Sequence, residues 1–347
     1  MTVMERNKVT AQDVARRAGV SQSAVSRVFT PGASVSKAMV TKVITAVKEL
    51  DYRPNALARS LITGRSKLIG LVVAYLENNF FLTEVLEKLS KALQEEGYRV
   101  LMFITKQSAE NIDDVLSDIL DYQVDGVVMA SVEMSSELAT RCQATGIPVV
   151  LFNRSQADDR LSAVTSDNFS GGRKVAEFLI KGGHKNIGYV AGWEGASTQR
   201  DRESGFRAGL QELGFDIQAR EIGDYRFEGA QEATRRMFAS GDRIDAIFAA
   251  NDHMAFAVMD VLRAELGVRV PDDVSVIGYD DVPLAAWPSY NLTTVSQSAG
   301  VMVHETVRIL LDQIDDPLAK SRRISFDGPL IVRGSARVPK GWTDEGI

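Results

Sequence analysis

The stretch VTAQDVARRAGVSQSAVSRVF, residues 9–29, determines how the N-terminal end of this 347-residue chain is expected to fold. Thr10 is followed three residues later by Asp13, which predicts a helix that begins after Thr10. The Thr10 hydroxyl can accept a backbone N–H of the first turn, and a carboxylate suits the positive end of a helix. Gly19 is expected to end this helix, because glycine adopts the left-handed backbone of a helix terminus without strain.

Two more helices are predicted after the glycine. Ser21 is a capping residue for a second short helix, from Gln22 to about Phe29, and Ser36 caps a longer one, from about Lys37 to Leu50. Two short helices separated by a three-residue turn that begins with glycine are typical of the helix–turn–helix, whose second helix enters the DNA major groove. The alternative is a small helical bundle with no role in DNA binding.

The outward side chains of the second helix are the predicted DNA contacts. Gln22 and Ser23 are short hydrogen-bonding side chains that can reach base edges, and the planar fork of Arg27 matches guanine O6 and N7. Ser21 and Ser26 are better suited to phosphates, which set the register of a protein on DNA without reading its sequence. Thr10 is also expected to contact the DNA.

Charge is distributed unevenly along the chain. The net charge is −6, yet residues 1–67 hold 12 Lys and Arg against four acidic residues, so this head carries +8 and the remainder −14. Basic side chains bind DNA because neutralised phosphates release their condensed counterions. A solvated basic helix would show the same charge, so the helix–turn–helix pattern is what favours DNA binding.

From Leu68 onward, apolar runs of strand length alternate with stretches of helical spacing. Such alternation is typical of parallel sheets covered by helices on both faces. We therefore expect an α/β body of two doubly wound parallel-sheet subdomains behind an all-α head. The strands are expected at 68–73, 99–104, 126–129, 148–152, 187–190, 246–249 and 274–278, and the helices at 81–96, 112–122, 136–145, 174–180, 202–213, 229–238 and 254–266.

Polar side chains follow several of these strands, where open α/β sheets bind their ligands. Amide, carboxylate and guanidinium groups there would suit a polyhydroxylated ligand, and aromatic faces could stack on a sugar or a base. Asp252 and Asp281 could equally cap helices, and Trp193 and Trp287 could simply pack. The residues expected to bind the effector are Phe80, Asn153, Arg200, Tyr225, Asn251, Asp280 and Trp287.

Several motifs resemble the lactose-repressor/galactose-repressor (LacI/GalR) family of transcription regulators. They match in order and spacing through the head, and weaker matches run to about residue 335. In this family, the positions that match Arg200, Asn251 and Asp280 bind the effector, which is most often a sugar and sometimes a purine. Asn153 departs from the acidic residue often found at its position. The motifs are VTAQDVA (9–15), AGVS (18–21), VSRV (25–28), YRPN (52–55), ALARSL (56–61), NDHMA (251–255), GYDD (278–281) and LTTVSQ (292–297).

A hinge is expected between the head and the body. Pro54 suits the first turn of a helix, but Asn55 to Leu61 are too few residues for a helix that is stable alone in water, so this segment could order and melt as a switch. The resemblance implies that two such helices pair in the minor groove, where Leu61 wedges between base pairs at a cost of about a few kcal/mol. Asn55, Ala58 and Arg59 complete the expected hinge contacts. The alternative for Leu61 is an ordinary buried leucine.

These patterns together predict four regions along the chain. The DNA-binding head covers residues 1–53 and the hinge 54–67. The first effector subdomain covers 68–153 and about 299–318, and the second covers 154–298 and about 319–340. No leucine-heptad tail follows Arg337, so we expect a homodimer that reads a pseudo-palindromic operator.

Other classes of protein fit the sequence less well. A single cysteine, Cys142, favours a reducing cytoplasm over a disulfide framework, and three histidines leave little for a zinc site. No apolar signal or span is evident, and no P-loop, dinucleotide fingerprint or nucleophile elbow indicates an enzyme or a cofactor. The expected function is a nucleoid-associated transcription regulator, with repression relieved by a sugar. The alternatives are a purine- or nucleoside-responsive regulator and a stand-alone sugar-binding protein.

Overall fold

The computed structural model describes residues 9–29, 33–52, 65–74, 80–105, 112–132, 141, 144–156, 159–241 and 243–342. The chain divides into two compact units, one up to Lys67 and the other from Leu68 onward. We call them the head and the body.

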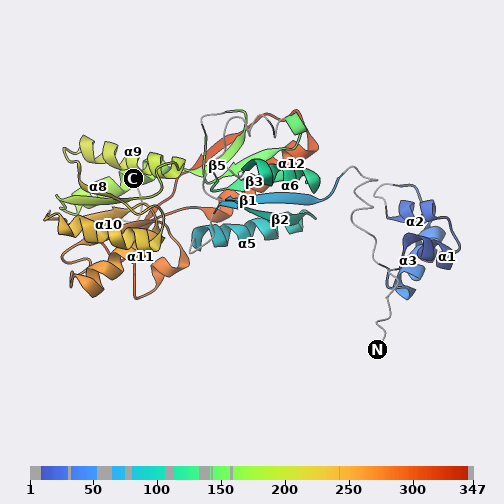
Figure 1. Cartoon of the computed structure of the whole chain (residues 1–347), viewed down its shortest axis with the longest axis horizontal. Helices are drawn as coiled ribbons and strands as arrows, with labels where there is room; N and C mark the ends of the chain where they lie inside the picture. The colour runs from blue at the N-terminus through green and yellow to red at the C-terminus, as the bar shows by residue number, and fades with distance from the viewer. Residues whose placement is uncertain are drawn as a thin grey trace. The chain divides into compact units, whose positions relative to one another are not determined.

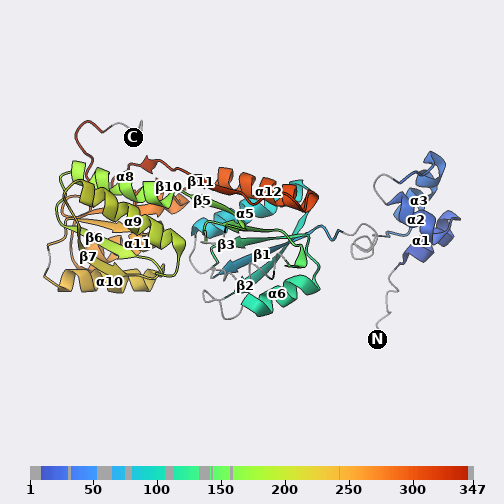
Figure 2. The ribbon, with the colours of Figure 1, turned by 90° about the horizontal axis from the view of Figure 1, so that it is seen from above.

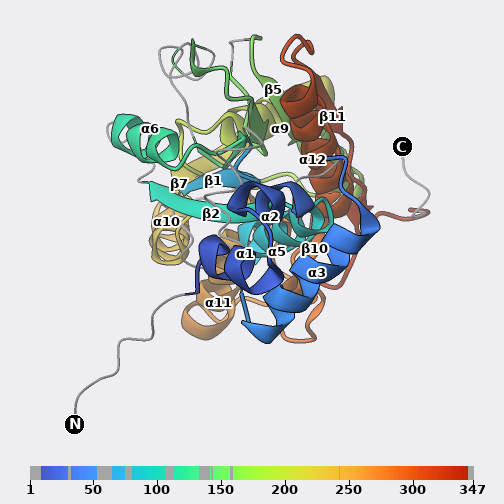
Figure 3. The same ribbon diagram turned by 90° about the vertical axis from the view of Figure 1, so that its right-hand side faces the viewer.

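The head contains three helices, α1 (Ala11–Ala18), α2 (Gln22–Val28) and α3 (Lys37–Glu49), drawn in blue in Figure 3. All three begin and end within a residue of the predicted bounds. Their buried faces meet in a small core whose centre is formed by Val14, Val25 and Val43, one from each helix. This confirms the predicted order of two short helices, a tight turn and a longer third helix.

The first subdomain of the body is built on a six-stranded sheet with the order β11-β5-β4-β3-β1-β2, parallel throughout. Helices α5 and α12 lie on one face and α6 on the other (Figure 2). The elements are β1 (Leu68–Ala74), α5 (Phe80–Glu95), β2 (Arg99–Thr105), α6 (Ile112–Asp121), β3 (Gly126–Ala130), β4 (Val149–Phe152), β5 (Ser162–Ser166), α12 (Ala299–Asp315) and β11 (Arg323–Phe326).

The second subdomain repeats the design with a sheet of the order β12-β10-β9-β8-β6-β7, in which only β12 runs antiparallel. Helices α8 and α9 cover one face and α10 and α11 the other (Figure 1). The elements are α8 (Asn168–Lys181), β6 (Ile187–Ala191), α9 (Ser197–Glu212), β7 (Ile217–Ile222), α10 (Phe227–Ala239), β8 (Ala246–Ala249), α11 (Asp252–Asp260), the π-helical turn η2 (Val261–Glu265), β9 (Ser275–Asp280), the 3-10 turn η3 (Pro283–Ala286), β10 (Thr293–Ser296) and β12 (Leu330–Ile331).

The run of apolar residues in β1 is continuous because both faces of the strand are buried. Ile69, Leu71 and Val73 point into the core under α5 and α12, while Val72 joins the opposite core beneath α6. A strand covered by helices on both faces must be apolar on both. The predicted parallel-sheet fold is thereby confirmed.

The chain crosses between the subdomains three times, after β5, after β10 and after β11. Strands β5 and β11 pair with each other in the first sheet, so the first subdomain extends beyond residues 153 and 318, where the sequence placed its ends. Both strands are short and only partly apolar in sequence, so they were not recognised as strands of the first sheet and were placed within the second subdomain. The predicted helix at 254–266 is α11 followed by η2, and most of the helix predicted at 136–145 lies outside the described residues.

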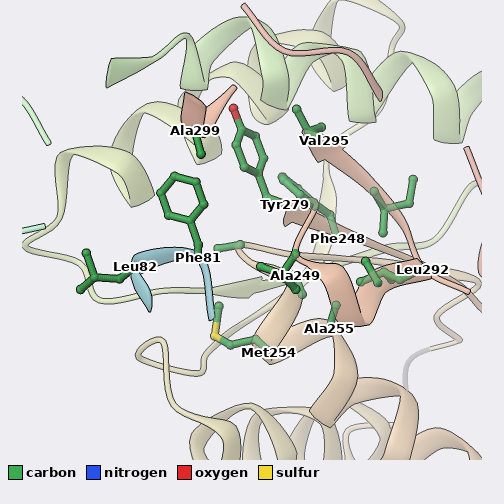
Figure 4. Close-up of a cluster of buried hydrophobic side chains, with 14 of the residues drawn as sticks. Phe81, Leu82, Phe248, Ala249, Met254, Ala255, Tyr279, Leu292, Val295 and Ala299 are labelled. Atoms are coloured by element: carbon green, nitrogen blue, oxygen red, sulfur yellow. The ribbon is translucent and has the colours of Figure 1, made fainter. Parts of the chain in front are cut away.

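The two subdomains share one apolar cluster. Figure 4 shows Phe81 of α5 beside Tyr279 of β9 and Ala299 of α12, with Met254 of α11 nearby, and all four are buried. The N-terminal ends of α5 and α11 therefore lie close together, although they belong to different subdomains. This contact brings the C-terminal edges of the two sheets together.

Candidate operator interface and effector site

The first turn of α1 is capped in both directions. The Asp13 backbone N–H donates to the Thr10 hydroxyl (3.3 Å), and the Thr10 backbone N–H donates to the Asp13 carboxylate (3.0 Å). These bonds satisfy backbone donors that a helix start leaves without partners. Gly19 has φ of +65° and ends the helix with its N–H on the carbonyls of the last turn, as the sequence predicted. Thr10 is thus first a capping residue, and its hydroxyl donates to Asp13.

The exposed face of α2 carries the predicted base readers. Gln22, Ser23 and Arg27 are exposed, whereas Ser26 is half-buried. Ser21 caps the helix, its hydroxyl accepting the Ala24 N–H (3.2 Å) and lying 2.9 Å from the Ser23 hydroxyl. The head thus presents a short helix with polar side chains outward. The predicted hinge contacts Asn55, Ala58, Arg59 and Leu61 lie outside the described residues.

In the body, unusual backbone conformations gather where strands end. Ser131 after β3, Asn153 after β4, Tyr225 after β7 and Asp280 at the end of β9 all have positive φ values. Such conformations cost about 1–3 kcal/mol each when the residue is not glycine, and they concentrate at binding sites. The C-terminal edges of both sheets are therefore shaped to present side chains.

A buried arginine, Arg202, forms the centre of this edge in the second subdomain. Its Nε donates to Asn168 Oδ1 (2.7 Å), its Nη1 donates to the Ala250 carbonyl (2.5 Å), and its Nη2 lies 3.5 Å from Asp280 Oδ1. The guanidinium stacks over the Tyr279 ring at 3.6 Å. A guanidinium has five N–H groups. These three contacts account for three of them, and the other two make no hydrogen bond among the described residues.

Arg200, and not Arg202, was predicted as an effector contact, but the Arg200 side chain is largely exposed. The Arg200 side chain is 62% exposed and lies 3.7 Å from Asp201, whereas that of Arg202 is 2% exposed. The burial of Arg202 could have been predicted from helical spacing. Arg202 shares a helix face with the buried residues Phe206 and Gly209, four and seven positions further on.

Asp280 is the acidic counterpart of Arg202. Its Oδ1 accepts from Gln297 Nε2 at 2.6 Å. Burial raises the pKa of Asp280 to about 6, although Arg202 and the Gln297 hydrogen bond both oppose the shift. The Gln297 Oε1 atom is buried and has no hydrogen-bond partner within the described residues. Gln297 lies in the LTTVSQ motif (292–297), but it was not predicted as an effector contact.

Two nearby carboxylates have structural roles. Asp252 is fully buried, accepting from the Val282 N–H (2.9 Å) and the Thr294 hydroxyl (2.5 Å), and burial followed by the charge of Asp280 raises its pKa well above the usual value. Asp281 pairs with Arg333 at 2.7 Å. Both tie loops together.

Asn251 and Asn153 lie at strand ends, as expected. Asn251 Oδ1 caps α11 by accepting the Met254 N–H (3.0 Å), which leaves the amide N–H groups for another acceptor. Asn153 Nδ2 donates to Ser131 Oγ (3.1 Å), and its buried Oδ1 has no partner in the described part of the chain.

Three aromatic residues were predicted to reach the ligand. The Tyr225 ring covers the backbone of Gly192 and its hydroxyl lies 3.2 Å from that of Thr198. Phe80 packs edge-on against His253, with ring centres 5.9 Å apart. Trp287 follows η3 and is 55% exposed, and no ring contact joins it to the described aromatic residues.

No three His, Cys, Asp or Glu side chains among the described residues group as metal ligands. None of the described helices has the length and apolar character that crossing a bilayer requires.

Comparisons with known proteins agree with this architecture. Residues 10–55 match the family described as bacterial regulatory proteins, lacI family, and residues 176–336 match the periplasmic binding protein-like domain. The HTH-type transcriptional repressor PurR of Photobacterium profundum is 32% identical over 94% of this chain and 98% of its own length. The ribose operon repressor of Escherichia coli is also 32% identical, over 94% of this chain and 99% of its own.

Solved structures give the same result. The lac repressor dimer bound to operator and the anti-inducer ONPF superposes with a TM-score of 0.86 at 27% identity, covering 95% of this chain and 99% of that one. The complex of the transcriptional regulator CelR with cellobiose gives 0.72 at 30% identity, covering 94% of this chain and 100% of that one. A helix–turn–helix head and two parallel-sheet subdomains are thus matched over nearly the full length by repressors rather than enzymes. The chain belongs to the lacI family of bacterial regulatory proteins and is a DNA-binding transcriptional regulator with an effector-sensing body.

Proposed function

We propose that this regulator represses transcription as a homodimer on a pseudo-palindromic operator and that a sugar bound in the body lowers its operator affinity. Two-fold symmetry in the protein requires two half-sites in the DNA. Gln22, Ser23 and Arg27 read base edges, while Ser21, Ser26 and Thr10 lie near phosphates. The protein acts in the cytoplasm, associated with the nucleoid.

The hinge couples the two functions. Asn55, Ala58 and Arg59 contact the minor groove and Leu61 wedges between base pairs. Leu61→Ala should weaken operator binding and reduce DNA bending in a gel-shift bending assay, with effector affinity nearly unchanged. Unaltered curvature would remove Leu61 from the mechanism.

The observation that carries the effector proposal is a set of unmatched hydrogen-bonding groups at the sheet edges. Asn153 Oδ1 and Gln297 Oε1 are buried acceptors without donors among the described residues, and Arg202 retains two N–H donors. A buried polar atom without a partner costs about 1–3 kcal/mol, so a bound ligand gains by satisfying it. Vicinal hydroxyls donate and accept at the same atom, which matches this mixture of donors and acceptors.

Charge supports the same ligand class. The Arg202–Asp280 pair offers a cation and an anion side by side, which suits a neutral polyol better than an anionic ligand. Asn251 and Asn153 add amides. Tyr225, Phe80 and Trp287 are the aromatic residues available to cover sugar C–H faces. Domain closure around the sugar would shift the first subdomains and so the hinge.

A purine is the second candidate, because purine-repressor relatives match as well as the ribose repressor does. Calorimetry on the full-length protein with D-ribose, D-glucose, cellobiose and hypoxanthine separates the two. We expect a sugar to bind, and Arg202→Lys to weaken binding at least tenfold while the control Arg200→Ala changes it less than threefold. Equal losses in both variants, or binding of hypoxanthine alone, would overturn the sugar proposal.

A further inference from the structure

His253 lies between aromatic rings of the two subdomains. Its ring centre is 5.9 Å from that of Phe80, at the start of α5, and 5.4 Å from that of Phe227, at the start of α10. The neighbouring residues Phe81 and Met254 are buried in the cluster that the subdomains share (Figure 4). His253 therefore occupies a contact that exists only while the two subdomains are together.

The imidazole is also a neighbour of the proposed effector site. His253 is the second residue of α11, and the preceding Asn251 caps that helix at the C-terminal end of β8. Phe80 begins the helix that follows β1. The ends of parallel strands in such sheets are where ligands bind, and His253 lies at the strand ends that Asn251 and Phe80 also mark.

One ring nitrogen of His253 has no hydrogen-bonding role within the described protein. The residue is 9% exposed, and its buried Nδ1 has no partner among the described residues. Burial lowers the pKa of His253, an effect that the charge of Glu228 opposes, so the ring is neutral at physiological pH. A neutral imidazole holds one N–H donor and one acceptor nitrogen. The edge-on contact with Phe80 and the tilted contact with Phe227 give Nδ1 no hydrogen-bond partner.

We propose that His253 is a specificity-determining residue of the effector site, which hydrogen-bonds a ligand hydroxyl through Nδ1 while its ring joins the two subdomains. The inference rests on the proposed sugar-binding function and adds a residue to it. A ligand hydroxyl can donate to Nδ1 when this nitrogen is unprotonated and accept from it when it carries the ring proton. A polyol can therefore bind either tautomer without a change in the charge of the ring. Because the same ring contacts Phe80, ligand binding and subdomain contact stabilise one another.

The wild-type protein permits a direct test, because the chain has only three histidines, His184, His253 and His304. In full-length protein labelled with ¹⁵N-histidine, His253 is assigned by loss of its signals in His253→Asn. D-ribose, D-glucose, cellobiose and hypoxanthine are screened by thermal shift, and the compound with the largest shift is the probe. We expect the probe to move the His253 Nδ1 resonance by several ppm and to leave the buried His184 unmoved.

Two substitutions separate hydrogen bonding from packing. His253→Asn retains a polar atom near the Nδ1 position and should keep the probe Kd within threefold of wild type. His253→Leu retains only bulk and should raise the probe Kd at least tenfold. An unmoved Nδ1 resonance in the wild type, or a His253→Leu Kd within threefold, would overturn the role of His253.

The outcomes also distinguish this inference from the function on which it rests. If hypoxanthine is the probe and still moves the His253 signal, the sugar proposal fails and His253 keeps its role. If none of the four compounds binds, both fail.

Discussion

Asp280→Asn should make the body more stable and less able to sense its effector. The buried carboxyl has a pKa of about 6 in the folded protein against an ordinary value of 3.8. Each tenfold change in proton affinity corresponds to about 1.4 kcal/mol, so the ionised side chain costs the folded state about 3 kcal/mol at neutral pH. An asparagine removes that cost while it keeps the shape of the side chain.

The direction of the pKa shift determines the pH range over which the stability changes. A carboxyl whose folded pKa is raised destabilises the protein as pH rises from about 4 to 6, and the full cost persists above that range. The gain from Asp280→Asn should therefore be about a third of its full size at pH 4.5 and complete at pH 7.5. For a domain of this size, about 3 kcal/mol corresponds to a rise in Tm of roughly 6 °C.

The assay is thermal unfolding of the full-length protein at pH 4.5, 6 and 7.5, followed by tryptophan fluorescence, with Asp281→Asn as the matched control. Asp281 already pairs with Arg333, so that change should not raise Tm. Effector affinity of Asp280→Asn should fall about tenfold or more, because a hydrogen bond to a charged group contributes about 1.5–3 kcal/mol. A Tm for Asp280→Asn that is unchanged or lower at pH 7.5 would refute this reasoning.

The other predictions concern the effector site, the head and the edge of the first sheet. Effector affinity of the wild type should rise several-fold between pH 5 and pH 7.5, since ionised Asp280 is the stronger acceptor; calorimetry giving a flat profile would count against Asp280 as a ligand contact. Arg27→Ala should relax base preference in selection from random duplexes, whereas the exposed Arg16→Ala should only weaken binding uniformly. Thr10→Ala should destabilise the head by about 1 kcal/mol, measured by urea unfolding of its helical signal, because the capping bonds are lost. Ile104→Glu on the exposed edge strand β2 should raise the monomer fraction in sedimentation, and an unchanged dimer would place the interface elsewhere.

The sequence predicted the structure best where the stabilising interactions join residues that are close together in the chain. Thr10, Ser21 and Ser36 each cap a helix, and Gly19 ends one, because these effects involve residues three or four apart. The long apolar strands were recognised because burial on both faces leaves no polar position. The edge strands β7, β11 and β12 carry no such pattern, since each has only one neighbouring strand. Strand β5 has two neighbours, but Ser162, Thr165 and Ser166 interrupt its apolar pattern.

The effector site was harder to predict because it is assembled from distant segments. The positions of Asp280 and Asn251 at strand ends were predicted from the apolar runs that precede them. Arg202 and Gln297 were missed because their roles depend on burial against β9, which the order of residues alone does not reveal. His253 adds a third example, as its partner Phe80 lies far away in the chain.

The most direct test of the central claim is fluorescence anisotropy with an operator selected by the full-length protein, titrated with and without the sugar that binds best. The account predicts nanomolar binding that falls at least tenfold on sugar addition, and sugar affinity that falls by the same factor when operator is present, because linkage is reciprocal. Equal affinity for selected and random duplexes, or operator binding indifferent to every bound sugar, would contradict it.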